Sequence, residues 1–259
     1  MKKNLPLVIL QITAFIIMIV VNALANILPI NGLNTGEVSA FYPNYFVPAG
    51  FTFSIWGIIY LLLAVYLFAS TQLLLKKNND ATKEKMSIQV AKIFIGTCIL
   101  NASWIFAWHY LQVLASVFIM LLFLFTLTIM YIKQQQATVS FTPFQQFAIH
   151  IPFVVYLAWI CVATIANITA LLISIGFNGI GVEPTTWSIC MIIVATLLAI
   201  YFGIKEKQWA FCAIISWALY GILQGQKSSS YAIGLTATIC MVVVLIATVI
   251  ATYDKKKSV

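Results

Sequence analysis

Apolar runs of about twenty residues recur along the whole chain, separated by short polar segments. An α-helix of that length crosses the hydrocarbon core of a bilayer with all its backbone hydrogen bonds satisfied internally. The pattern therefore predicts an all-α fold, a polytopic membrane bundle of about eight transmembrane helices. We place them at about 6–28, 51–75, 88–108, 110–132, 147–172, 187–204, 208–225 and 231–253, the seventh being short.

Composition supports this class of protein. Of the 259 residues, 63% are hydrophobic and only 8% are charged, which is too few charges to cover the surface of a soluble domain. The net charge of +8 does not indicate nucleic-acid binding, because the lysines cluster in short loops. The first apolar run has no small-residue cleavage site, so we interpret it as a retained span.

Lysine placement predicts the orientation. With eight spans, every lysine except Lys227 falls on one side of the membrane. The positive-inside rule then puts both termini in the cytoplasm. Lysine without arginine, together with frequent Ile and Asn, suggests a bacterial protein of the inner (cytoplasmic) membrane. The lysines on the predicted cytoplasmic side are Lys2, Lys3, Lys76, Lys77, Lys83, Lys85, Lys92, Lys133, Lys205, Lys207, Lys255, Lys256 and Lys257.

The predicted outer loops, 29–50 and 173–186, contain no lysine. The first is long enough to fold back over the bundle, and its aromatic side chains suit the membrane interface. These are Phe41, Tyr42, Tyr45 and Phe46.

No catalytic or metal site can be assembled from the sequence. Ionisable residues within membrane spans usually mark function, and the predicted spans contain essentially none. His109 and His150 lie near span ends, and no motif for hydrolysis or metal binding includes them. The five cysteines occur singly within apolar segments, which favours buried hydrophobic roles over disulfides or metal ligation. They are Cys98, Cys161, Cys190, Cys212 and Cys240.

Uncharged polar and aromatic residues share faces on several spans. Trp56 and Tyr60 are four residues apart, as are Trp104 and Trp108, with Asn101 on the same face. The fifth span carries Tyr156, Trp159 and Asn167 in the same manner. Two interpretations explain such faces. One is packing between helices, with Asn side chains forming hydrogen bonds across them, and the other is a cavity for a flat apolar ligand. At 1.5 Å per residue, Trp56, Asn101 and Asn167 all lie within about 10 Å of the outer helix ends, and Trp159 lies roughly 18 Å deep.

Three segments resemble the translocator protein family, the tryptophan-rich sensory proteins (TspO/MBR). FVPAGFTFSIWGIIY is similar to that family's second-helix motif, NASWIFAWHY to its third-helix end, and IPFVVYLAWICVATIAN to its fifth-helix pattern. Where the family has a second proline and loop tryptophans, this chain has Ala49, Tyr45 and Phe46. The resemblance covers residues 1–172, which implies a TspO-like five-helix membrane domain followed by a three-helix extension over 173–259.

The resemblance implies that Trp56, Asn101 and Trp159 line a ligand pocket capped by the first outer loop. Such pockets are associated with porphyrins, haem and sterol-like molecules, so a tetrapyrrole is a candidate ligand and no cofactor is required. The further candidate ligand-binding residues are Pro48, Phe53, Tyr60, Trp104, Tyr156 and Asn167.

We therefore expect a membrane protein, not an enzyme, that binds a hydrophobic, planar small molecule as a sensor, regulator or carrier. The expected partners are that molecule and the lipid bilayer, and a homodimer is a further candidate. Nucleic acid is not an expected partner. Three alternatives remain. The first is a secondary transporter or uniporter of a small solute, and the second a structural membrane subunit. The third is an intramembrane lipid-modifying enzyme using His109, His150 or Glu183.

Overall fold

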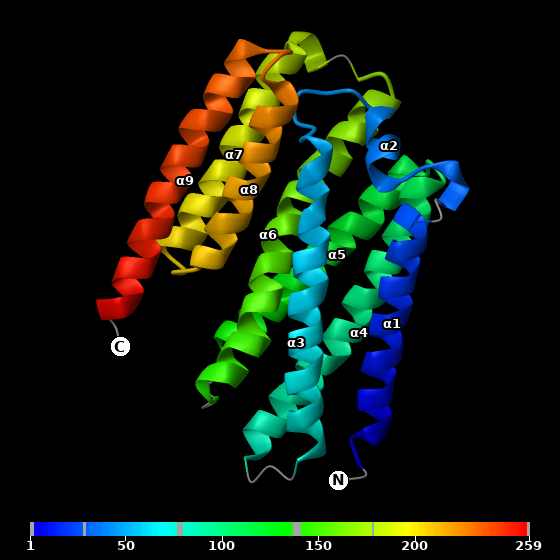
Figure 1. The fold of residues 1–259 in the computed structure, drawn as a ribbon, viewed down its shortest axis with the longest axis vertical. Coiled ribbons are helices and arrows are strands. Elements are labelled where there is room, and N and C mark those ends of the chain that lie inside the picture. The colour runs from blue at the N-terminus through cyan, green and yellow to red at the C-terminus, as the bar shows by residue number, and fades with distance from the viewer. Residues whose placement is uncertain (1–2, 28–29, 77–79, 137–140, 178, 258–259) are drawn as a thin grey trace. The chain divides into compact units, whose positions relative to one another are not determined.

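The fold is described from a computed structural model, over residues 3–27, 30–76, 80–136, 141–177 and 179–257. Throughout these ranges the ordered elements are helices, as Figure 1 shows, and no strand occurs among them. Lys2 and Lys77, two of the lysines used above to predict orientation, lie outside the described residues.

The predicted spans agree with the observed helices to within a few residues at most ends. The helices are α1 (Leu5–Ile27), α3 (Ile55–Leu75), α4 (Ala81–His109), α5 (Val113–Gln135), α6 (Pro143–Ser174), α7 (Pro184–Ile204), α8 (Trp209–Gln226) and α9 (Tyr231–Lys257). The sequence pattern missed one short helix, α2 (Thr35–Ala40), and the 3-10 turns η1 (Ile30–Gly32), η2 (Gly50–Ser54) and η3 (Gly179–Gly181).

Seven helices in the described part of the chain are long and apolar enough to cross a membrane, and α8 is not among them. Helix α8 forms where the seventh span was expected, but glutamines and aromatic residues make its 18 residues less apolar. It packs against both α7 and α9. Many of its side chains are buried, among them Phe211, Ile215 and Leu219. Protein contacts therefore bury this helix although its composition is less apolar than that of its neighbours.

The chain divides into two compact units, one comprising residues 1–35 and 56–156, the other 36–55 and 157–259. Helix α6 runs through both, so its first half belongs to unit 1 and its second half to unit 2. Pro152 lies within this helix, as membrane helices tolerate when neighbouring groups satisfy the freed carbonyl.

In unit 1, α1 packs along α4 and α4 along α5. Just before α1, the side-chain amide of Asn4 donates to the carbonyl of Leu74 (3.2 Å) and to the Glu84 side chain (3.2 Å). These contacts bring the start of α1 beside the loop between α3 and α4. Lys3, Lys76 and Lys83 consequently belong to one end of unit 1.

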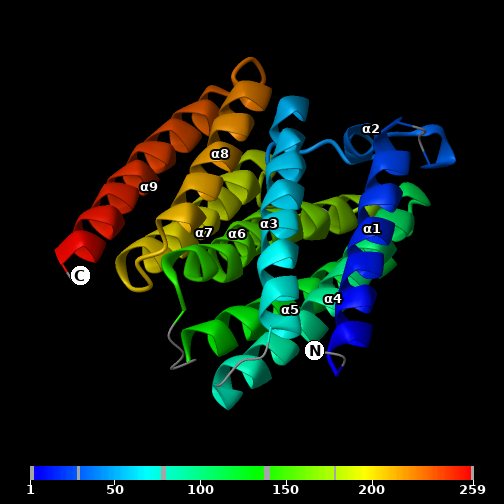
Figure 2. The same cartoon turned by 60° about the horizontal axis from the view of Figure 1, so that its bottom comes forward.

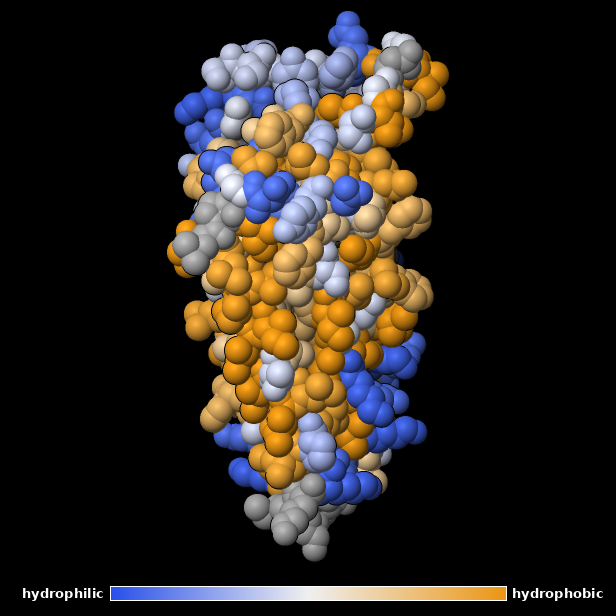
Figure 3. All heavy atoms as spheres, turned by 90° about the vertical axis from the view of Figure 1, so that its right-hand side faces the viewer, coloured by the Kyte–Doolittle hydropathy of each residue, from blue (hydrophilic) through white to orange (hydrophobic). Residues whose placement is uncertain are grey.

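The outward faces of α1 and α5 are apolar. Side chains such as Ile9, Ile16 and Phe118 are more than half exposed. Figure 3, viewed from the side of α1, shows hydrophobic residues over a broad middle band and hydrophilic ones toward the ends. Exposed apolar surface on this scale suits lipid rather than water. The protein is a multi-pass membrane protein.

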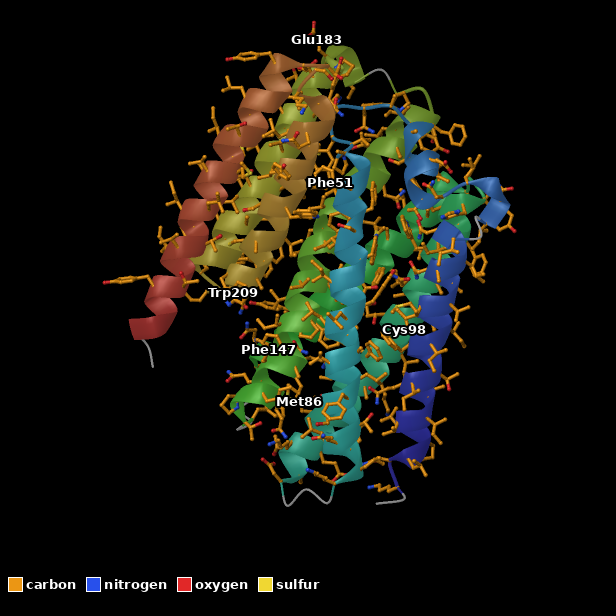
Figure 4. All side chains as sticks on the ribbon, in the orientation of Figure 1. Phe51, Met86, Cys98, Phe147, Glu183 and Trp209 are labelled. Atoms are coloured by element: carbon orange, nitrogen blue, oxygen red, sulfur yellow. The ribbon has the colours of Figure 1, made fainter. Side chains whose placement is uncertain are left out.

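In unit 2, α7, α8 and α9 lie side by side, as Figures 1 and 2 agree. The residues 36–55 also belong to this unit, and η2 packs against α8. Figure 4 shows Glu183 at one end of these helices and Trp209 at the other.

Candidate functional site

In unit 1, a buried chain of hydrogen-bonded side chains, two amides and one hydroxyl, joins helices α1, α4 and α6. The Asn22 side chain donates to the side-chain oxygen of Asn101 (2.6 Å), and the Asn101 amide nitrogen donates to the hydroxyl of Tyr156 (2.8 Å). Asn101 and Tyr156 are completely buried. Such amide bonds join helices where no water can compensate polar groups. Both ends of the Asn101 amide are thus used within the protein.

Aromatic rings surround this chain of amides. Trp56 stacks on Tyr60 with ring centroids 5.7 Å apart, and meets Tyr156 edge to face at 6.0 Å. Phe123 meets the same Tyr156 ring at 5.1 Å. The hydroxyl of Tyr60 is buried and has no hydrogen-bond partner among the described residues. Trp56, Tyr60, Asn101 and Tyr156 therefore form one packed group.

At the loop end of unit 1, Trp104 stacks on Trp108 (5.7 Å). The completely buried His109 ring lies 3.1 Å from the Thr35 hydroxyl and 3.2 Å from the carbonyl of Ile30. Both ring nitrogens thus connect the end of α4 to the segment that follows α1. His150 similarly contacts the Gln134 amide at 3.2 Å. These contacts give both histidines structural roles, and no His, Cys, Asp or Glu cluster in the described residues could hold a metal.

Within unit 2, helix α8 makes hydrogen bonds to the segment that precedes α3. The backbone nitrogen of Ala49 donates to the carbonyl of Gly221 on α8 (2.9 Å), and the Trp217 indole donates to the carbonyl of Thr52 (3.0 Å). Gln226, at the end of α8, donates to the carbonyl of Val47 (3.0 Å). We call residues 44–54 the entry segment. The last three turns of α8 therefore hold the entry segment through its backbone groups.

Two glycines make that approach possible. A Cβ at Gly221 would overlap the Thr52 side chain, and one at Gly225 would lie 2.9 Å from the backbone nitrogen of Ala49. The pair has the G-x-x-x-G spacing that lets a helix approach another backbone closely in membranes. Here its partner is the entry segment, not a second long helix.

A cavity of about 970 Å³ lies beside the entry segment, entirely within unit 2. Its walls are the first loop, the last turns of α6, the first turns of α7 and the end of α8. Most lining side chains are apolar, and a few amides and hydroxyls are interspersed among them. The lining residues are Ser39, Ala40, Pro43, Asn44, Tyr45, Val47, Ile168, Thr169, Leu172, Ile173, Phe177, Gly179, Val182, Pro184, Trp187, Ser188, Met191, Gly225, Gln226 and Ser229.

Trp187 supplies the aromatic surface of this cavity together with Phe177, whose ring centroid is 6.2 Å away. The Trp187 indole nitrogen is buried and has no hydrogen-bond partner in the described residues. It lies against Gly179, where an added Cβ would come within 2.9 Å of it. Gly179 also has a φ of +72°, so both the backbone conformation and the close approach of Trp187 require glycine at this position.

The nine predicted ligand-binding residues divide between the units. Trp56, Tyr60, Asn101, Trp104 and Tyr156 belong to unit 1. The other four belong to unit 2, where Phe53 meets Trp159 edge to face (6.3 Å), Pro48 lies against α8, and Asn167 is buried on α6. None of the nine lines the cavity, and their ligand-binding role stays a prediction.

Sequence reasoning expected the first loop to cap a pocket but missed the wall supplied by α7. One signal pointed to that wall: Trp187 and Met191 are four residues apart on one face of α7. Ile168 and Leu172 likewise continue the α6 pattern beyond Asn167.

The helices and this cavity define a polytopic helical membrane protein with an apolar pocket built partly from a long loop. The chain belongs to the family of TSPO-like proteins, whose sequence model matches residues 8–250 and thus includes α7, α8 and most of α9. No curated protein and no solved structure matches the chain.

Proposed function

We propose that this TspO-type membrane protein binds a hydrophobic, largely planar small molecule in the unit 2 cavity, acting as a sensor, regulator or carrier. The observation that carries the proposal is the cavity itself. Its volume of about 970 Å³ lies at the upper end of the roughly 300–1,000 Å³ usual for ligand sites.

The chemistry of the walls supports a molecule of this kind. Aliphatic side chains from α6 form one wall, and the indole of Trp187 offers a flat stacking surface. An aromatic contact adds about 0.5–1.5 kcal/mol beyond the burial of area. The amides of Asn44 and Gln226 provide the few polar groups that orient a ligand in an otherwise apolar pocket.

The first loop forms one wall of the proposed site. Six residues between Ser39 and Val47 line the cavity, and from Asn44 on they belong to the entry segment that α8 holds. Tetrapyrroles and sterol-like molecules are the ligand classes we propose, in line with the resemblance of the three motifs.

The test is a titration of the purified protein with a porphyrin and with a sterol, following tryptophan fluorescence. We expect saturable quenching by at least one of them. Ser188→Phe fills the cavity from α7 and should abolish the saturable part. Cys190→Phe is the matched control, since Cys190 is exposed on the same helix and does not line the cavity. Absent saturation, or identical titrations for both variants, would refute the proposal.

A further inference from the structure

We propose that the cavity selects uncharged or cationic apolar molecules and discriminates against carboxylates. The inference rests on the proposed function and names the class of ligand that the same site accepts. This ligand class excludes the porphyrins that carry two carboxylates, which are among the candidate ligands named above.

Among the described residues that form the walls, none has a charged side chain. All twenty lining residues are apolar, aromatic, hydroxyl or amide residues. The Gln226 amide nitrogen already donates to the carbonyls of Val47 and Asn44, at 3.0 and 3.4 Å. A carboxylate buried here would lose its hydration without meeting a cation, and that is the most unfavourable way to bury a charge.

The charges next to the lining residues are negative on balance. Glu183 lies between the lining residues Val182 and Pro184, and Glu37 lies two residues before Ser39. Both carboxylates are exposed. Lys227, which follows Gln226, is the one lysine near these positions in the described part of unit 2, and its ammonium group contacts the Gln224 side chain at 3.1 Å. In the sequence, two carboxylates and one ammonium group thus lie within two residues of described lining residues.

The helix ends do not reverse this balance. The C-terminal ends of α6 and α8 contribute lining residues and carry partial negative charge. The N-terminal ends of α7 and α9 lie at the same end of unit 2 and carry partial positive charge, and Glu183 sits directly at the start of α7. Helix ends of both signs thus border the cavity, and the side chains of its described walls add no charge.

A matched pair of probes tests the inference: protoporphyrin IX, with two carboxylates, and its dimethyl ester, with none. The macrocycle is the same, so only the charge differs. At low ionic strength we expect the ester to bind at least about tenfold more tightly, since the diacid must bury or crowd its charge. The cavity-filled Ser188→Phe protein measures partitioning of each probe into detergent, which is subtracted.

Charge reversal at Glu183, which lies between two lining residues, provides the second arm. Glu183→Lys should reduce the preference for the ester, and Glu183→Gln should reduce it less. Glu206→Lys is the control, because Glu206 follows α7 at the opposite end of unit 2. If the diacid binds as tightly as the ester, or if Glu183→Lys leaves the ratio unchanged, the inference is wrong while the binding site stands. If neither probe nor a sterol saturates, the proposed function itself fails.

Discussion

Replacing Gly225 with alanine tests whether α8 positions the loop wall of the cavity. The new Cβ would lie 2.9 Å from the backbone nitrogen of Ala49, and 3.2 Å from the Pro48 carbonyl carbon and the Val47 carbonyl oxygen. All three atoms are backbone, so no side chain can rotate away. Either the entry segment retreats from α8 or α8 moves.

The magnitude follows from these contacts. Overpacking of this kind destabilises by about 1–3 kcal/mol. Retreat of the segment also weakens the Ala49–Gly221 hydrogen bond (2.9 Å), worth about 0.5–1.5 kcal/mol net. Alanine regains up to about 1 kcal/mol of helix propensity over glycine. We therefore expect a net loss of about 1–3 kcal/mol, which combines these three effects.

The assay is thermal unfolding in detergent, combined with the fluorescence titration. Gly225→Ala should lower Tm by several degrees and weaken ligand binding, because Asn44 and Val47 belong to the cavity wall. Gly234→Ala on α9 is the control, since its Cβ would meet only Leu223 at 3.6 Å and Lys227 at 4.0 Å, which are ordinary contacts. A Gly225→Ala protein that melts and binds like Gly234→Ala would refute the positioning role of α8.

Three further predictions concern single contacts and topology. Asn101→Leu should lower Tm, at a cost of about 1–3 kcal/mol, because it leaves two buried hydrogen-bond partners unsatisfied. Gln226→Leu should weaken ligand binding by releasing the entry segment, whereas Gln224→Leu, whose side chain accepts a hydrogen bond from Lys227, should not. In a cysteine-free background, a membrane-impermeant maleimide should label Ser229→Cys from outside the cell and Lys207→Cys only after the membrane is opened; the reverse pattern would overturn the predicted orientation.

The local pattern of apolar residues was sufficient to predict the helices. A span's existence depends on the length of its own apolar run, so the predicted boundaries lie near the observed ones. The stacked pairs Trp56–Tyr60 and Trp104–Trp108 were likewise predictable, because residues four apart in one helix must be neighbours. Helix α8 departs from the pattern since its burial comes from α7 and α9 rather than from lipid.

The partners of polar and small residues were not predictable in the same way. Asn101 could have faced a ligand or another helix, and only the positions of Asn22 and Tyr156 show that its amide bonds within the protein. The Gly221–Gly225 pair signals a close approach but does not identify the approaching backbone. Nothing local connects these glycines with Pro48 and Ala49, which lie more than 170 residues earlier.

The sequence by itself determined that this chain is a helical membrane protein, where its spans lie, and which family its motifs resemble. Those properties depend on the transfer of short segments into lipid and on contacts within single helices. The tertiary structure decided where the cavity lies, since its walls come from a loop and three helices separated widely along the chain. Such a cavity forms where side chains from distant parts of the chain leave space between them, and no local sequence pattern encodes that arrangement.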